Sequence, residues 1–147
     1  MQALNLPPYN YSFTEKDSKT YIFDIIRKKY ILLNPEEWVR QHFINFLIEH
    51  RQYSKSLIKI ETGLHYGKRA KRTDIQVFGN SGELYILVEC KAPEIKLNQK
   101  VITQILQYNK VLSPQILAIT NGIEHVFINL LGNGTFEYLN DLPLQSH

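Results

Sequence analysis

The sequence predicts an α/β sandwich with a mixed sheet, and three observations lead to this prediction. The chain has 147 residues, which is about the size of one domain. Two segments carry apolar residues at helical spacing, and short, dense apolar runs typical of buried strands lie between and after them. The expected order is one helix, three strands, a second helix and two strands, which is neither all-helical nor a regular strand–helix repeat. We expect a single domain over residues 1–147 with its core at about 21–131.

The N-terminal part is expected to form an extension followed by a hairpin. Residues 1–19 are largely polar and are interpreted as an extension or an edge segment. Apolar and β-branched residues are dense from Tyr21 to Leu33, and the basic triplet Arg27-Lys28-Lys29 between them indicates a hairpin turn.

The first helix is expected over Pro35 to His50. Asn34 is a good N-cap, proline suits the first helical position, and the acids that follow oppose the positive end of the helix dipole. Apolar residues then recur at helical spacing, namely Val39, Phe43, Phe46 and Leu47.

The later elements are also marked by their apolar runs. Strands are expected at residues 57–60, 74–78, 84–90, 115–120 and 124–131, and a second helix at about 98–112. The run 84–90 is almost wholly apolar, as expected for a strand buried on both faces. Asn121-Gly122 indicates a tight turn between the last two strands.

The stretch Val88-Glu89-Cys90-Lys91 carries the strongest chemical signal. Side chains alternate along a strand, so Glu89 and Lys91 should point to one face and Cys90 into the core. A charge near a buried strand is costly unless it is paired or binds a ligand. If the strand that begins at Asp74 is a neighbour, the carboxylates of Asp74 and Glu89 can face each other.

Two carboxylates in this arrangement would make a hard-oxygen site, which suits Mg²⁺ or Mn²⁺. The backbone carbonyl of Cys90 could supply a further oxygen. A metal there would lower the pKa of a bound water and stabilise charge developing on a phosphodiester. Lys91 could orient the attacking water and neutralise part of that charge.

These residues resemble a known family. Asp74 followed by Glu89-x-Lys91 is similar to the PD-(D/E)xK nuclease motif. Further segments resemble the N-terminal nuclease domain of type I restriction enzyme R subunits, namely Pro35 to Gln41, Arg72-Thr73-Asp74-Ile75, Val88 to Pro93, Gln104-x-x-x-Tyr108 and Asn121-Gly122. The resemblance covers roughly Tyr21 to Leu131. Thr73 departs from it by replacing the proline of the motif name, and 147 residues leave no room for the DNA-translocating motor of an R subunit.

The resemblance implies a restriction-endonuclease-like three-layer sandwich, with a central mixed sheet flanked by helices, and an Mg²⁺-dependent DNA endonuclease. Asp74 and Glu89 would be metal ligands, and Lys91 would be the catalytic lysine. Gln104 and Tyr108, four residues apart on one helical face, would lie over the active site near the DNA.

The resemblance also implies an acid on the first helix that assists the metal site. Glu37 is favoured because it precedes Arg40 by three residues, and Glu36 is the alternative. The same acid can equally be a favourable first-turn charge and nothing more. Arg40 is expected to pair with an acid rather than to contact DNA.

A basic segment leads directly into Asp74. It contains Lys68, Arg69, Lys71 and Arg72, which we expect to contact DNA phosphates, although such a run is usually a solvated loop. The expected partners are DNA, a second copy of the chain, and the helicase, methyltransferase or specificity subunits of a restriction system. Without an export signal or an apolar run long enough to span a bilayer, the chain is expected to be cytoplasmic.

Two other functions stay open at this point. The first is a non-cleaving nucleic-acid-binding module of the same fold that needs a partner chain. The second is a purely structural or interaction protein, in which Glu89 and Lys91 are only an ion pair at a strand end. An intact set of Asp74, Glu89 and Lys91 favours the enzyme.

Overall fold

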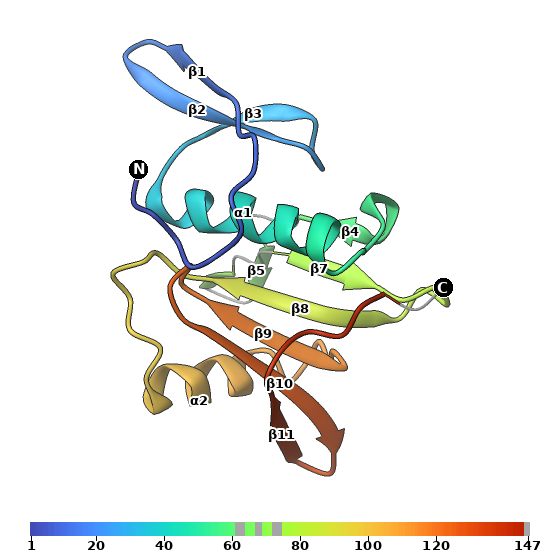
Figure 1. Ribbon diagram of the computed structural model, residues 1–147. Helices are drawn as coiled ribbons and strands as arrows, with labels where there is room; N and C mark the ends of the chain where they lie inside the picture. Colours follow the sequence, from blue (N-terminus) through green and yellow to red (C-terminus); the bar gives the residue numbers. More distant parts are fainter. Residues whose placement is uncertain (61–63, 67–68, 72–74, 146–147) are drawn as a thin grey trace.

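The computed structural model describes residues 1–60, 64–66, 69–71 and 75–145. A mixed six-stranded sheet occupies the middle of the molecule, with the helices α1 and α2 on its two sides and a separate three-stranded sheet beyond α1 (Figure 1). The molecule is therefore α/β, with the mixed sheet that the sequence predicts. Among the described residues, no helix has the length and apolar character needed to cross a membrane.

The three-stranded sheet is built by the N-terminal residues. It contains β1 (Phe13–Lys16), β2 (Lys19–Asp24) and β3 (Lys29–Leu32), all antiparallel and in the order β1-β2-β3. The predicted hairpin at the basic triplet is confirmed, and Lys28 adopts a positive φ of 56° in its turn. Part of the expected extension forms the edge strand β1.

Helix α1 (Pro35–His50) begins and ends at the predicted residues. The side chain of Asn34 accepts a hydrogen bond from the Glu37 backbone N–H at 2.7 Å, which confirms the predicted N-cap. The helix is buried well beyond its apolar stripe. Trp38 and His42 pack on Tyr11 of the N-terminal segment, with ring centroids 5.0 Å and 6.4 Å away.

The six-stranded sheet has the order β11-β10-β9-β8-β7-β4. Its strands are β4 (Ile58–Lys59), β7 (Ile75–Phe78), β8 (Leu84–Cys90), β9 (Ile116–Thr120), β10 (His125–Gly132) and β11 (Thr135–Leu139), and a short 3-10 helix, η1 (Lys55–Leu57), precedes β4. Strands β8 and β9 are parallel, and the other neighbours are antiparallel. A separate two-stranded sheet pairs β5 (Leu64–Tyr66) with β6 (Arg69–Lys71).

Helix α2 (Gln99–Tyr108) follows the N-cap Asn98 and is shorter than expected at its C-terminal end. Asn109 is its C-cap, and the side-chain amide of Asn109 donates to the Ile105 carbonyl at 2.9 Å. The predicted turn between β9 and β10 is confirmed, with Gly122 at φ +87°.

Two apolar clusters fill the two sides of the six-stranded sheet. On the α1 side, Val39, Phe43 and Leu47 pack with residues that include Ile86, Val88 and Cys90 of β8. On the α2 side, Ile102 and Ile105 pack with residues that include Leu87, Leu117 and Ile119. Successive residues of β8 thus alternate between the two clusters, and this alternation fixes the direction of the charged residues at its end.

Candidate functional site at the end of strand β8

Glu89 and Lys91 lie where the central strand β8 ends. Glu89 is half-buried and follows Leu87 by two residues, so the alternation of β8 directs it to the α2 side of the sheet. Cys90 is buried in the opposite cluster, as predicted. Lys91 is also half-buried. The charged pair therefore occupies the edge of the α2 side and not the middle of the core.

Hydrogen bonds to the neighbouring strand fix the backbone at this end. The Lys91 N–H donates to the Thr120 carbonyl at 2.8 Å, which extends the pairing of β8 and β9 by one residue. The side-chain amide of the buried Asn121 donates to the Ile95 carbonyl at 2.8 Å, and its oxygen accepts from the Glu124 N–H at 2.7 Å. Asn121 thus ties the chain that follows Lys91 to the turn between β9 and β10.

The second expected carboxylate, Asp74, lies outside the described residues. The strand that follows it, β7, is the antiparallel neighbour of β8, and Ile75 pairs with Val88. The two strands are therefore neighbours, which is the condition for Asp74 and Glu89 to face each other.

The basic segment falls in the same part of the chain. Lys68 and Arg72 are also outside the described residues, and Arg69 and Lys71 belong to β6, whose side chains the structure does not describe. Their contact with DNA stays a prediction.

Gln104 and Tyr108 lie one turn apart on α2, the helix that covers the side of the sheet to which Glu89 points. Gln104 is exposed and Tyr108 is half-buried. Helix α2 packs on the sheet through Ile102 and Ile105. The structure therefore brings the Gln104–Tyr108 element to the same side of the sheet as Glu89.

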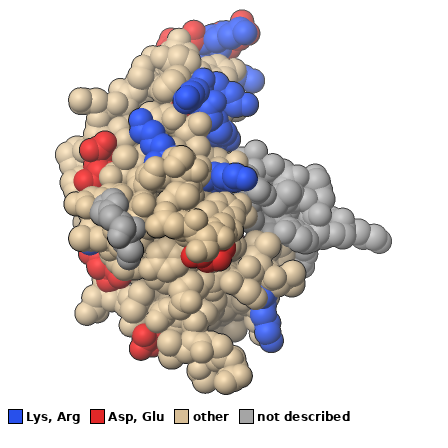
Figure 2. Space-filling model, turned by 90° about the vertical axis from the view of Figure 1, so that its right-hand side faces the viewer, with Lys and Arg blue, Asp and Glu red and all other residues tan. Residues whose placement is uncertain are grey.

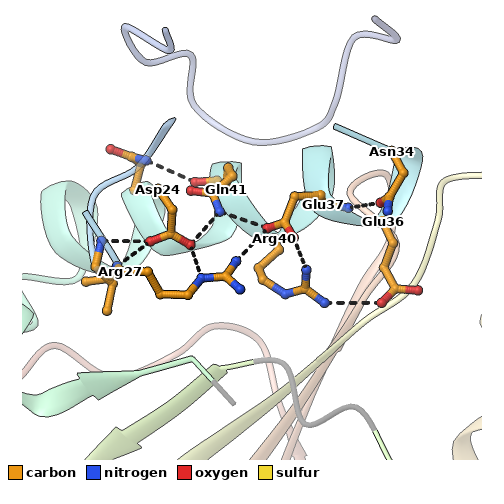
Figure 3. Close-up of polar contacts among 9 residues, drawn as sticks. Asp24, Arg27, Asn34, Glu36, Glu37, Arg40 and Gln41 are labelled. Carbon is orange, nitrogen blue, oxygen red and sulfur yellow. Dashed lines mark hydrogen bonds and ion pairs between the residues drawn. The ribbon is translucent and has the colours of Figure 1, made fainter. Parts of the chain in front are cut away.

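Glu37 lies on α1, on the other side of the sheet, within a buried polar cluster that we call the α1 network. The network comprises Asp24, Arg27, Glu36, Glu37, Arg40 and Gln41 (Figure 3). The Glu37 side chain is 5% exposed. One of its oxygens accepts from Arg40 Nη1 at 2.5 Å, and the other accepts from Gln41 Nε2 at 2.8 Å and Arg27 Nη2 at 3.3 Å. The predicted pairing of Arg40 with an acid is confirmed.

Asp24 is the second buried carboxylate of the α1 network. Its Oδ1 accepts the backbone N–H groups of Ile26 and Arg27, each at 2.8 Å, while its Oδ2 accepts from Arg27 Nε at 2.7 Å and Gln41 Nε2 at 2.9 Å. Burial raises the pKa of Asp24, but these hydrogen bonds and the Arg27 charge outweigh burial, so its pKa is lowered.

The same charges act on Tyr9 of the N-terminal segment. Burial, and then the negative charges of Asp24 and Glu37, raise the pKa of the Tyr9 phenol. The phenol of Tyr9 therefore stays protonated at neutral pH.

Sequence reasoning did not identify Asp24, Arg27 and Gln41. Gln41 stands four residues after Glu37, a spacing that places both on one side of a helix. Asp24 and Arg27 flank the predicted hairpin turn, and an acid three residues before an arginine is too common to single out. Their contact with α1 is tertiary, so only the fold reveals it.

The α1 network also lies close to the end of the sheet that carries Glu89. A Cβ built on Gly122, in the turn after β9, would lie 3.0 Å from Val39 Cγ2 of α1. Because β8 and β9 are parallel, their carboxyl ends share this edge, and α1 starts beside it (Figure 1). Within the described residues, which leave out Asp74, no three His, Cys, Asp or Glu side chains form a group that could hold a metal ion.

Comparisons with known proteins bear on the same residues. A search of curated proteins finds no match to this chain. A family model described as type I restriction enzyme R protein N terminus (HSDR_N) matches residues 35–143, from the first residue of α1 to beyond β11. The match includes Glu89, Lys91, Gln104 and Tyr108, and it leaves out β1, β2 and β3. The chain therefore belongs to the type I restriction enzyme R protein N-terminal family, and this membership indicates a restriction-related function.

Proposed function

We propose that the chain is an Mg²⁺-dependent DNA endonuclease domain of the PD-(D/E)xK type with a restriction-endonuclease-like fold. The observation that carries the proposal is the position of Glu89 and Lys91 at the end of β8, on the side of the sheet that α2 covers. An acid and a lysine two residues apart at the end of a central strand, in a member of a restriction enzyme family, favour hydrolysis over an isolated ion pair.

The donor chemistry fits a hard divalent cation. Asp74 and Glu89 would supply carboxylate oxygens, and Cys90 would supply its backbone carbonyl. The thiol of Cys90, a soft ligand that would favour zinc, is buried in the α1-side cluster, away from this site. When bound, Mg²⁺ (or Mn²⁺) would neutralise phosphodiester charge and acidify a water.

The remaining site residues would position the substrate. Lys91, whose backbone is held by Thr120, would orient the attacking water and stabilise negative charge on the phosphate. Gln104, exposed on α2, would contact DNA directly, and Tyr108 one turn later would support it. Arg27, Arg40 and Gln41 hold both carboxylate oxygens of Glu37. Glu37 would therefore assist the metal site by positioning the residues around it rather than by contacting the substrate.

Plasmid nicking tests this proposal. We expect the wild-type chain to nick supercoiled plasmid with Mg²⁺ and not with EDTA, and Asp74→Ala and Lys91→Ala to lower the rate at least about a hundredfold. Lys96→Ala, which removes an exposed lysine from the loop after β8, is the matched control and should cleave normally. Equal cleavage by the wild type and Lys91→Ala would overturn the mechanism.

The burial of Glu37 favours one second candidate, a nucleic-acid-binding module that cleaves only with a partner chain. A carboxylate held by three donors contributes to structure without any need for catalysis. Calorimetry separates the two functions, because Mg²⁺ binding that Glu89→Gln abolishes, without hydrolysis of any DNA, supports the module. The partners expected in either case are DNA, other restriction subunits or a second copy of the chain.

A further inference from the structure

The three-stranded sheet has one side that does not pack on α1. Ile22 and Asp24 of β2 are fully buried, and Asp24 accepts a hydrogen bond from Gln41 of α1, so this side of β2 faces α1. Because side chains alternate along a strand, Tyr21 and Phe23 point to the opposite side, which we call the outer face. The family match begins at residue 35, so the family assignment says nothing about this sheet.

The strand register shows which side chains share the outer face. One row across the sheet contains Phe23, which pairs with Tyr30 of β3. The two rings pack edge to face with centroids 5.2 Å apart, and the Tyr30 hydroxyl reaches over to Ser12 Oγ at 3.0 Å. The next row contains Tyr21 opposite Leu32. Tyr30 is 43% exposed and Leu32 is 44% exposed, so aromatic and apolar surface faces solvent here.

Lysines lie at both ends of this aromatic surface. Lys16 pairs with Lys19 in the row beyond Tyr21, and the alternation of β2 places Lys19 on the outer face. At the other end, the exposed Lys28 occupies the turn between β2 and β3. Lys19 and Phe23 are four residues apart along β2, or about 13 Å. Figure 2 shows Lys and Arg side chains gathered in the upper part of one side of the molecule, the end at which Figure 1 places this sheet.

A second exposed aromatic pair provides a comparison within the same molecule. Phe136 and Tyr138 of β11 also pack edge to face, at 5.6 Å, and are 40% and 55% exposed. Neither β10 nor β11 contains a lysine or arginine. Exposed aromatic residues are therefore found on both surfaces. The outer face differs from the β11 surface because lysines lie at both ends of its aromatic residues.

We propose that the outer face of the three-stranded sheet binds unpaired nucleic acid. Bases would stack on Tyr30 and Phe23, and the phosphates on either side would contact Lys19 and Lys28. Stacking on aromatic side chains and salt-dependent phosphate contacts are the usual means of binding a single strand without sequence preference. Glu15 and Asp17 lie near Lys16, so the end at Lys28 should carry most of the charge complementarity.

Hydrogen bonds within the β2–β3 turn and to α1 hold the turn in place. Asp24 binds the backbone of Ile26 and Arg27, and the Arg27 guanidinium connects the turn to Glu37 of α1. The outer face is therefore fixed relative to α1 before a strand binds. This surface is distinct from the proposed cleavage site and does not depend on cleavage.

Fluorescence anisotropy with a labelled oligothymidylate, in EDTA so that no cleavage occurs, tests the proposal. Tyr30→Ala should weaken binding about tenfold, and Tyr30→Phe, which keeps the ring, should bind as the wild type does. The double variant Lys19→Gln/Lys28→Gln should reduce the slope of log affinity against log salt by roughly 0.7 per lysine. The wild type should bind the single strand more tightly than a duplex of the same length.

Matched controls are available elsewhere on the chain. Tyr138→Ala removes the comparison aromatic, and Lys55→Gln/Lys110→Gln removes two exposed lysines outside the three-stranded sheet. Both should leave oligothymidylate affinity unchanged, with folding of every variant checked by thermal unfolding. Equal effects of Tyr30→Ala and Tyr138→Ala, or an unchanged salt slope, would overturn the proposal. Equal plasmid nicking by the wild type and Lys91→Ala, together with retained oligothymidylate binding, would overturn the proposed function and leave this proposal intact, so the two proposals fail separately.

Discussion

At the scale of single residues, Asp24 combines complete burial with full charge. Its two oxygens accept four hydrogen bonds, from the backbone of its own turn, from Arg27 and from Gln41. Replacing the acid by an amide would direct an NH₂ group at one pair of donors. When a buried ion pair loses one charge, the opposite charge stays buried without a partner. This unpaired charge is the main reason why such a substitution lowers the free energy of unfolding.

We predict that Asp24→Asn lowers the free energy of unfolding at pH 7 by about 3 kcal/mol. Because the folded state lowers the pKa of Asp24, its stabilisation is fully present above the unfolded-state pKa of about 4 and is lost as pH falls through the lower folded-state pKa. The gap between wild type and variant should therefore narrow below about pH 4.

Urea denaturation across this pH range measures the gap. Asp141→Asn is the matched control, because Asp141 pairs with Arg51 near the surface, where its side chain is 50% exposed. That change should cost less than about 1 kcal/mol. A gap between wild type and Asp24→Asn that stays constant down to pH 2 would contradict the prediction.

At the scale of elements, the turn between β9 and β10 packs closely against α1 and the N-terminal segment. Gly122 adopts φ +87°, and a Cβ at this position would lie 2.8 Å from Leu4 Cδ2 and 3.0 Å from Val39 Cγ2. The Gly122 carbonyl also accepts from the Asn5 N–H at 2.7 Å. Both the backbone conformation and the close packing therefore require glycine here.

We predict that Gly122→Ala lowers the free energy of unfolding by about 2–4 kcal/mol, the sum of strain at positive φ and overpacking. Gly82→Ala is the matched control, because Gly82 has φ +85° and a Cβ there would meet nothing within 4 Å. The control isolates the cost of the backbone conformation, about 1 kcal/mol. Chemical denaturation gives both values, and equal costs would mean that the Leu4 and Val39 side chains move aside to accept the methyl group.

The elements also show how far the sequence predicts this structure. Helix α1 and strand β8 were predicted residue for residue, because one has capping signals at its start and the other is a continuous apolar run. The sequence does not predict strands β1 and β11, because β1 has a single apolar residue and the alternation of Phe136 and Tyr138 in β11 covers only a few residues, most of them exposed. The turn before β11 does carry a sequence signal, because Asn133-Gly134 is a typical pair for a tight turn. Both residues adopt a positive φ in the structure.

The candidate site is predictable from the sequence only where its residues interrupt a clear local pattern. Glu89 and Lys91 interrupt an apolar run, so their positions at the end of a buried strand follow from the sequence. The role of Glu37 does not, because its partners Arg27 and Gln41 matter only once the β2–β3 turn packs on α1.

At the scale of the whole molecule, residues before the family match complete the burial of α1. Gln2 accepts a hydrogen bond from Trp38 Nε1 at 2.7 Å through its backbone carbonyl, and Tyr11 packs edge to face on the same indole. Asp24 and Arg27 provide partners for Glu37 and Gln41. Residues 35–143 alone would therefore expose apolar surface and buried charges of α1.

We predict that deleting residues 1–33 lowers the midpoint of thermal unfolding by more than about 10 °C. Trp38, which is the single tryptophan of the chain and is 5% exposed, should shift its emission to longer wavelength. Circular dichroism and fluorescence measure both effects. A deletion variant with the wild-type midpoint and emission would show that α1 needs no cover from the N-terminal residues.

The bond from Asn5 to Gly122 has a consequence for how the chain folds during its synthesis. Most neighbouring strands of the six-stranded sheet follow one another along the chain, so they can pair as each leaves the ribosome. Leu4 and Asn5 leave the ribosome before α1 and every strand of the six-stranded sheet, yet their partner lies in the turn after β9, which emerges after most of that sheet. The contact between Asn5 and Gly122 therefore forms only once β9 and its turn have been made, although Asn5 precedes α1 in the chain.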